Sequence, residues 1–255
     1  MFGKKKRMMS LDDYASKLLR NEEANLPTMP PAEEQMRFTG KSQVDTMRQA
    51  VDFLQNVERG YQTRTGRSLE NAQILDFGCG WGRMLRLLPF FTNHIYGCDP
   101  LQDALDLCGR HHVPGDLRRS DYLPTSLPFP DASMDAVIAY SIFTHTSETA
   151  TLAALDAIRK VIAPGGVVAI TIRPRTYWLL PRRNLEDEAL SSILEKHDSH
   201  GFSYLPHNGP KAPPHFGQTS MTLDWLKSHA PNWQISLHDR DLEDPYQRLV
   251  FLSPT

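Results

Sequence analysis

The sequence is poor in cysteine, has no long apolar run and carries no excess of charge of either sign. Its three cysteines, Cys79, Cys98 and Cys108, form an odd set without a Cys-x-x-Cys pair, so we predict reduced thiols in a cytoplasmic protein. No apolar run approaches the roughly 18 residues that a membrane-spanning helix needs. The basic residues 4–7 lack the apolar segment of a signal peptide, and a solvated tail is favoured there over membrane contact. We therefore expect no stable membrane association.

The charge is nearly balanced, with 28 basic and 30 acidic residues among 255 and a net charge of −2. No basic run interleaved with aromatic residues is present, so no nucleic-acid partner is expected. The length suits an α/β core of about 180 residues with helical additions.

The most informative stretch is residues 74–83, Ile-Leu-Asp-Phe-Gly-Cys-Gly-Trp-Gly-Arg. A short apolar run, typical of a buried strand, leads into Gly78, Gly80 and Gly82. Glycines at alternate positions let the chain turn tightly and bring bare backbone against a ligand, because a Cβ would hold the ligand off. The spacing is Gly-x-Gly-x-Gly, whereas dinucleotide enzymes have Gly-x-Gly-x-x-Gly. This stretch therefore predicts a nucleotide cradle between a strand and a helix.

From residue 73 onward, short apolar runs alternate with helical patterns, which is typical of βαβ units and a mostly parallel sheet. We predict strands at residues 73–77, 94–98, 116–120, 134–140 and 166–173, and two further apolar runs lie at 233–238 and 247–252. Helices are predicted at residues 11–24, 44–61, 83–90, 102–111 and 149–162.

Two further motifs follow the glycines. Gly-Cys-Asp-Pro occupies residues 97–100, and the run Pro-Phe-Pro-Asp-Ala-Ser-Met-Asp leads into the fourth strand, with Met134 as its apolar filler. Together with Ile-Leu-Asp before the glycines, these motifs resemble the class I S-adenosylmethionine-dependent methyltransferases, specifically over residues 70–174 and loosely over 218–252. The resemblance implies an enzyme with a Rossmann-like, seven-stranded, mostly parallel sheet, helices on both faces and an antiparallel last strand. It implies S-adenosyl-L-methionine as the cofactor.

The resemblance places the cofactor contacts in the loops after the first four strands, where ligands of such sheets lie. Asp76 would help to fix the amino group of the cofactor, Asp99 would accept the ribose hydroxyls, and Asp121 would take the adenine amino group. An alternative, in which these carboxylates only cap strand ends or a turn, stays open. The residues assigned to the cofactor are Asp76, Gly78, Cys79, Gly80, Gly82, Asp99, Pro100, Asp121, Tyr122 and Tyr140.

His145, in the loop after the fourth strand, is the candidate general base, because its ordinary pKa lets it take a proton near neutral pH. The alternative is a histidine that only hydrogen-bonds the loop backbone. Methyl transfer from a sulfonium has a neutral leaving group, needs no metal and can rest on alignment alone. The histidines near the end of the chain fit no standard ligand spacing, so no metal site is predicted; they are His197, His200, His207 and His215.

Two parts of the chain carry no motif. Residues 1–69 are predicted to form an N-terminal helical extension, interpreted as a lid over the cofactor or, in the first forty residues, as a disordered leader. Residues 70–255 form the methyltransferase domain, in which about 174–232 are inserted before the last two strands. An insertion of that length is usually functional, so we predict a substrate cap that contains a helix at 184–196.

The acceptor is predicted to be a small molecule with a hydroxyl, amine or carboxylate, and the sequence leaves its identity and the oligomeric state open. Arginines near the cap, Arg173, Arg175, Arg182 and Arg183, suit an acidic substrate or a solvated face. For Arg83, a solvated position is favoured over contact with a carboxylate. The rival functions are a non-catalytic methyltransferase-like binding protein and a nicotinamide-dependent oxidoreductase, which the glycine spacing disfavours.

Overall fold

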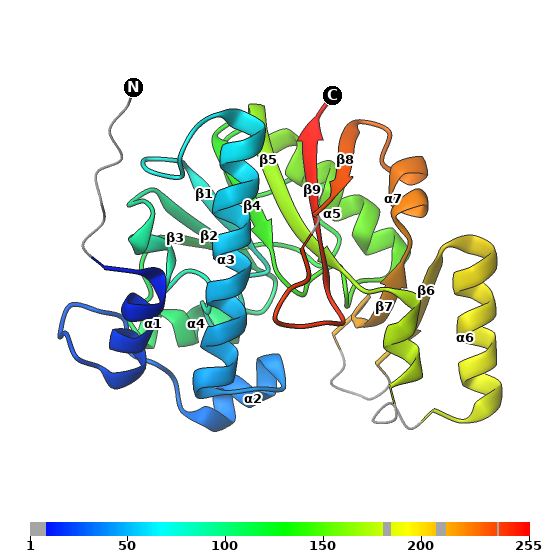
Figure 1. Ribbon diagram of the computed structural model, residues 1–255, viewed down its shortest axis with the longest axis horizontal. Coiled ribbons are helices and arrows are strands. Elements are labelled where there is room, and N and C mark those ends of the chain that lie inside the picture. Colours follow the sequence, from blue (N-terminus) through cyan, green and yellow to red (C-terminus); the bar gives the residue numbers. More distant parts are fainter. Residues whose placement is uncertain (1–8, 181–184, 208–212, 239) are drawn as a thin grey trace.

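A mixed sheet of seven strands lies at the centre of the computed structural model, which describes residues 9–180, 185–207, 213–238 and 240–255 (Figure 1). The strand order is β3-β2-β1-β4-β5-β9-β8, with β1 to β5 parallel and β9 antiparallel to both of its neighbours. The strands are β1 (Ile74–Phe77), β2 (Ile95–Asp99), β3 (Asp116–Arg119), β4 (Met134–Ala139), β5 (Ile162–Ile172), β8 (Trp233–Leu237) and β9 (Arg248–Pro254). The predicted fold class is therefore confirmed.

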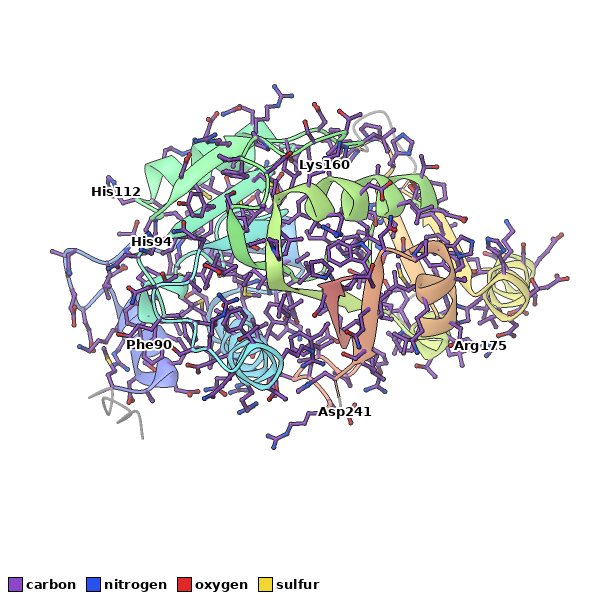
Figure 2. All side chains as sticks on the ribbon, turned by 90° about the horizontal axis from the view of Figure 1, so that it is seen from above. Phe90, His94, His112, Lys160, Arg175 and Asp241 are labelled. Carbon is purple, nitrogen blue, oxygen red and sulfur yellow. The ribbon has the colours of Figure 1, made fainter. Side chains whose placement is uncertain are left out.

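Helices cover both faces of this sheet, as Figure 2 shows for the cyan α3 and the green α5. One buried cluster joins the sheet to α1, α3 and α4, and a second joins it to α5 and α7. Alternate residues of a strand enter opposite clusters, which is why the central strands are apolar throughout. The helices are α1 (Leu11–Arg20), α2 (Ala32–Thr39), α3 (Gln43–Thr65), α4 (Gln102–Arg110), α5 (Glu148–Val161), α6 (Asp187–His200) and α7 (Leu223–His229), with 3₁₀ turns η1 (Leu88–Phe90) and η2 (Arg175–Leu179).

No helix in the described part of the chain combines the length and the apolarity needed to cross a membrane.

The segment after the glycines differs from its prediction, because residues 83–90 form successive turns that end in η1 and no regular helix. The backbone hydrogen bonds of this segment span different numbers of residues. The Arg86 N–H donates to the Gly82 carbonyl four residues back, and the Leu87 N–H donates to the Met84 carbonyl three residues back. The Arg86 side chain is fully buried and donates to the carbonyls of Trp81 and Thr28. This arginine therefore ties the N-terminal segment to the glycine turn.

The insertion before the last two strands contains more regular structure than its polar composition predicts. Its helix, α6, begins at Asp187, and the predicted start at residue 184 lies outside the described residues. No strand was predicted in the stretch 198–220, which contains most of a hairpin of β6 (Phe202–Pro206) and β7 (Gly217–Met221). Two polar side chains of β7 are used in hydrogen bonds: the Thr219 hydroxyl donates to the Thr146 carbonyl, and the Ser220 hydroxyl accepts from the Trp178 ring N–H. β7 therefore lacks the alternation of apolar and polar residues by which a strand is predicted.

Close approach of α3 to the sheet depends on Gly60. A Cβ at this position would overlap the ring of Phe251 on β9, which is almost fully buried. The guanidinium of Arg64, one turn further along α3, lies 4.0 Å from the centroid of the same ring. The long helix therefore packs on β9 through a glycine and an arginine that share one phenylalanine.

We predict that Gly60→Ala lowers the free energy of unfolding by roughly 1–3 kcal/mol, because the added methyl overpacks the contact with Phe251. Gly109→Ala is the control: Gly109 also lies in a helix, α4, but its Cβ would meet nothing within 4 Å. That control should leave stability unchanged or raise it by up to about 1 kcal/mol. Chemical denaturation of both variants checks this, and equal effects would contradict the packing described for α3.

Candidate active site

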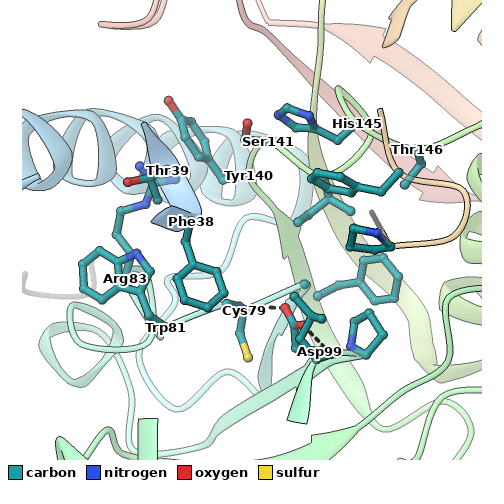
Figure 3. Close-up of a pocket in the computed structure, with 18 of the residues that line it drawn as sticks. Phe38, Thr39, Cys79, Trp81, Arg83, Asp99, Tyr140, Ser141, His145 and Thr146 are labelled. Carbon is teal, nitrogen blue, oxygen red and sulfur yellow. Dashed lines mark hydrogen bonds between the residues drawn. The ribbon is translucent and has the colours of Figure 1, made fainter. Parts of the chain in front are cut away.

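A cavity of about 780 Å³ lies at the carboxyl ends of the parallel strands, beside the point where the strand order reverses between β1 and β4. The loops after β1, β2, β3 and β4 line it, together with the end of β5. Residues 37–41, at and after the end of α2, line a further part, and η2, the β6–β7 hairpin, α3, α5 and the segment before β9 also contribute. Figure 3 shows part of this lining, with Phe38 and Thr39 near Arg83 and with His145 beyond Ser141.

The three predicted glycines all adopt positive φ angles, of 73°, 52° and 78° for Gly78, Gly80 and Gly82, which only glycine adopts at low cost. Their surroundings differ. A Cβ at Gly78 would overlap Ile142, and a Cβ at Gly82 would lie 2.8 Å from Val113, whereas a Cβ at Gly80 would meet nothing within 4 Å. Gly80 lines the cavity, so bare backbone faces open space at this position. Gly82 instead allows close packing behind the turn.

Asp99 joins the end of β2 to this turn. Its Oδ2 accepts a 2.8 Å hydrogen bond from the Gly80 N–H, and its Oδ1 accepts a 2.9 Å bond from the Leu101 N–H (Figure 3). Burial raises the pKa of this carboxyl, and the two backbone bonds oppose that rise. An ionised carboxylate accepts about four hydrogen bonds. Each oxygen therefore keeps acceptor capacity toward the cavity.

Asp76, at the end of β1, is 3% exposed and lies between unlike charges. Burial raises the pKa of its carboxyl to about 7, with the Arg83 guanidinium acting against the rise and Asp99 adding to it. Arg83 is itself buried, lines the cavity and lies 4.7 Å from the centroid of the Tyr140 ring. The solvated position favoured for Arg83 is therefore wrong. Its place after the glycines resembles an exposed first helical turn, and no regular helix forms there.

The remaining residues assigned to the cofactor also lie at the cavity. Pro100, Asp121 and Tyr122 line it beside Asp99. Tyr140 is buried and packs edge-on against Phe53 of α3, with ring centroids 4.8 Å apart, and burial raises the pKa of its hydroxyl. Cys79 lines the cavity as a buried thiol, whose pKa is raised by a hydrogen bond with Cys108 and by burial. The structure thus brings all the assigned residues except Gly82 to one cavity.

His145 has partners on both ring nitrogens. Its Nδ1 lies 2.7 Å from the Gly217 carbonyl of β7, and its Nε2 lies 3.0 Å from Nη2 of Arg173. A carbonyl only accepts and a guanidinium only donates, so Nδ1 carries the hydrogen and Nε2 accepts. The ring also stacks on Phe216, with centroids 4.9 Å apart. His145 can take a proton on Nε2 only when the Arg173 contact opens, and its role as a base stays a prediction.

Sequence reasoning noted Arg173 as an arginine near the cap, but it missed Tyr177 and Gln218 beside it. Arg173 directly follows β5, Tyr177 lies in η2 and Gln218 lies on β7, and all three line the cavity. They come from segments far apart in the chain, so no local pattern connects them. Of the other arginines noted near the cap, Arg175, labelled in Figure 2, pairs with Asp198 of α6, and residues 182–183 lie outside the described residues.

Among the residues that the structure describes, no group of three or more His, Cys, Asp and Glu side chains is placed to hold a metal ion. Of the histidines near the chain end, His197 and His200 lie on α6, while His207 and His215 line the cavity.

Residues 74–166 match a family described as a methyltransferase domain. A tRNA (carboxymethyluridine(34)-5-O)-methyltransferase of Arabidopsis thaliana is 32% identical over 105 residues, which cover 39% of this chain and 23% of that protein. The chain thus spans about a quarter of the length of this curated relative.

Two solved structures share the fold at low identity. A complex titled DhpI-SAH is 15% identical, with a TM-score of 0.55 over 96% of this chain and 95% of that chain. The magnesium protoporphyrin IX methyltransferase (ChlM) of Synechocystis PCC 6803 with bound SAH is 14% identical, with a TM-score of 0.54 over 88% and 94%. The domain match confirms the resemblance to methyltransferases, and the two solved structures show the shared fold.

The raised pKa of Asp76 predicts a pH-dependent stability. Because its pKa rises from 3.8 to about 7 on folding, the protonated form is favoured in the folded state. The stabilisation is complete below about pH 4 and is lost as the pH rises through 7. Asp76→Asn stays neutral and should not show this loss. In chemical denaturation of the ligand-free protein, the variant should gain stability over the wild type between about pH 5 and pH 8, and a constant difference would contradict the buried carboxyl.

Proposed function

We propose that this chain, which carries a class I S-adenosylmethionine-dependent methyltransferase domain, transfers a methyl group to a hydroxyl, amine or carboxylate of a small-molecule acceptor. The observation that carries the proposal is one cavity in which the open backbone of Gly80 and two buried carboxylates, Asp76 and Asp99, face the side chains of the cap. The Gly80 backbone and the two carboxylates suit a nucleoside with an amino acid portion. The end of the cavity lined by the cap leaves room for an acceptor.

The cofactor half is assigned from charge and hydrogen-bonding capacity. Asp99 has acceptor capacity left for the ribose hydroxyls after its two backbone bonds. Asp76, whose pKa is raised to about 7 by burial, lies near the Arg83 guanidinium, and this pair suits the amino and carboxylate groups of the methionine portion. Asp121 and Tyr122 line the same cavity beside Asp99, and we assign them to the adenine. When bound, S-adenosyl-L-methionine supplies a methyl group activated by a positively charged sulfur.

The main contribution of the protein itself is to align the acceptor with the methyl group that is transferred. Hydrogen bonds hold the loop after β4 in place for this. The Ser141 N–H donates to the Thr171 hydroxyl at 2.8 Å, and that hydroxyl donates to the Gln247 side chain at 2.5 Å. On the other side, the carbonyl of His145 accepts from the Gly217 N–H at 2.7 Å. These bonds hold the loop to β5, to Gln247 just before β9, and to the cap. A loop held in this way can fix the reacting groups in line, and such alignment accounts for a large part of the barrier reduction in these displacements.

We further propose that α2 and the residues after it act as a lid. Residues 37–41 line the cavity, and Gly40 ends α2 with a φ of 64° that lets the chain reverse there. The side chain of Gln35 links both ends of the segment, donating to the Pro30 carbonyl and accepting from the Gln43 N–H, each at 2.8 Å. This arrangement covers the cofactor half with a segment that is separate from the sheet.

The acceptor is proposed to be a small molecule, although the curated relative named above acts on tRNA. The net charge of −2 gives no general attraction for a polyanion. The cap also lines the acceptor end, which favours a compact ligand. A screen of small acceptors and of bulk tRNA with isotopically labelled cofactor, scored by mass shift, tests this. Labelled tRNA with no labelled small molecule would overturn the proposed acceptor class.

Filling the glycine cradle should weaken cofactor binding. We predict that Gly80→Ala lowers the affinity for S-adenosylhomocysteine at least about tenfold, or 1.4 kcal/mol, because the methyl occupies space facing the cavity. Gly66→Ala is the matched control, since Gly66 also has a positive φ, of 69°, and an open Cβ position, but lies outside the cavity lining. Both variants should lose a similar stability of about 1 kcal/mol from backbone strain. Calorimetry that shows equal affinities for the two variants would remove Gly80 from the cofactor site.

A further inference from the structure

Arg83 is a buried cation whose hydrogen-bond donors the protein itself does not engage. It is 9% exposed, and its guanidinium carbon lies 4.7 Å from the centroid of the Tyr140 ring (Figure 3). The charges of Asp76 and Asp244 act on it, but no residue that the structure describes forms a hydrogen bond or an ion pair with it. A guanidinium keeps its proton in proteins and presents a planar fork of N–H donors. At the wall of the cavity, this fork is available to a planar anion.

A second unengaged donor belongs to Gln49, the residue that α3 contributes to the cavity lining. Gln49 is 6% exposed, and its Nε2 is buried without a hydrogen-bond partner in the described part of the chain. Buried amide groups are normally paired, because an unpaired one loses its bonds to water and gains none. An unpaired amide at a cavity wall therefore points to a partner that arrives with the ligand.

Tyr140 connects the elements that carry these two donors. Gln49 and Phe53 are four residues apart on α3 and so lie on the same face of the helix. The Phe53 ring packs edge-on against Tyr140, with centroids 4.8 Å apart, and the Arg83 guanidinium lies against the same tyrosine. Gln49 and Arg83 therefore both enter the cavity lining next to this aromatic pair.

The other cations of the lining are placed differently. Arg37 is exposed and pairs with Glu34 at 3.3 Å, and Lys41 is exposed as well. Arg173 is buried, but it donates to the Thr144 carbonyl and to other groups at the cap end. Arg83 thus combines burial with unengaged donors, which the other three cations do not.

Two acidic side chains act on Arg83 and decide which anion suits it. Burial raises the pKa of Asp76 to about 7, so this carboxyl carries only part of its charge near neutral pH. Asp244 already accepts from the Tyr246 N–H at 3.1 Å and from Nε2 of Gln247 at 3.3 Å. A ligand with an ammonium beside its carboxylate would satisfy Asp76 and Arg83 together, whereas a simple anion would face the acidic groups without compensation. The other acidic residues of the lining are Asp99, Asp103 and Asp121.

We propose that Arg83 and Gln49 together bind the carboxylate of the methionine portion of the cofactor, Arg83 through two parallel N–H bonds and Gln49 through its amide N–H. The inference rests on the proposed function and deepens it, because it adds a binding residue of α3 that lies outside every cofactor motif. Since α3 follows the proposed lid directly, the Gln49 contact ties residues 37–41 to the presence of the cofactor.

The test compares S-adenosylhomocysteine with decarboxylated S-adenosylhomocysteine, which keeps the amine and lacks only the carboxylate. Both ligands are titrated calorimetrically into the full-length protein. The wild type should bind S-adenosylhomocysteine at least about tenfold more tightly than the decarboxylated ligand, because only the first engages Arg83 and Gln49.

Gln49→Met removes the amide and keeps the length of the side chain. It should weaken binding of S-adenosylhomocysteine at least about threefold and leave binding of the decarboxylated ligand unchanged. Because the substitution removes an unpaired buried N–H, it should also keep or raise the thermal midpoint without ligand. Gln62→Met is the matched control, since Gln62 is an exposed glutamine of the same helix outside the cavity lining. This control should bind both ligands as the wild type does.

Arg83→Lys keeps the positive charge that acts on Asp76 and loses the planar fork. It should weaken binding of S-adenosylhomocysteine at least about fivefold, and binding of the decarboxylated ligand less than about twofold. If Arg83→Lys does not fold, Gln49→Met still decides the test.

Equal affinity of the wild type for the two ligands would overturn the inference. So would a Gln49→Met protein that binds S-adenosylhomocysteine like the wild type, or one that loses affinity for both ligands by the same factor. A wild-type protein that binds neither ligand would instead overturn the proposed function, so the two failures are distinguishable.

Discussion

The hydrogen bond between the Asp99 carboxylate and the Gly80 N–H is the constraint on which the site depends. It fixes the turn after β1 to the end of β2, so the open backbone of Gly80 and the Asp99 carboxylate line the same cavity. A turn with a φ of 52° at Gly80 has no side chain of its own to hold it. The carboxylate supplies that support, and in the proposed function the same carboxylate binds the cofactor ribose.

Buried ionisable side chains are concentrated around this turn, and the charge of each one shifts the pKa of its neighbour. Burial raises the pKa of the Asp76 carboxyl to about 7, while the nearby Arg83 guanidinium favours the ionised form of that carboxyl. A ligand with a positively charged amino group would complete the balance, so binding and ionisation of Asp76 are coupled. At the other end of the cavity, Arg173 donates to the Thr144 carbonyl and to Gln218.

Much of the sheet could be predicted from the sequence, and so could the residues that gather at one end of the cavity, because strand, turn and carboxylate follow one another within a few residues at Asp76 to Gly82 and at Gly97 to Asp99. The arrangement at the cap end could not be predicted. Arg173, Tyr177 and Gln218 meet only after the cap hairpin docks on the loop after β4. The irregular segment 83–90 was predicted to be a helix because its apolar spacing suits one. Burial of Arg86 against the Trp81 and Thr28 carbonyls requires another backbone path there.

The central claim is that this cavity holds S-adenosylmethionine and that the Asp99–Gly80 pair shapes it for that cofactor. Calorimetric titration of the purified wild-type protein with S-adenosylhomocysteine and, separately, with NAD tests the claim most directly. The account predicts saturable binding of S-adenosylhomocysteine with a dissociation constant in the micromolar range, as is usual for enzyme ligands, and no heat with NAD. Binding of NAD with no response to S-adenosylhomocysteine would contradict it.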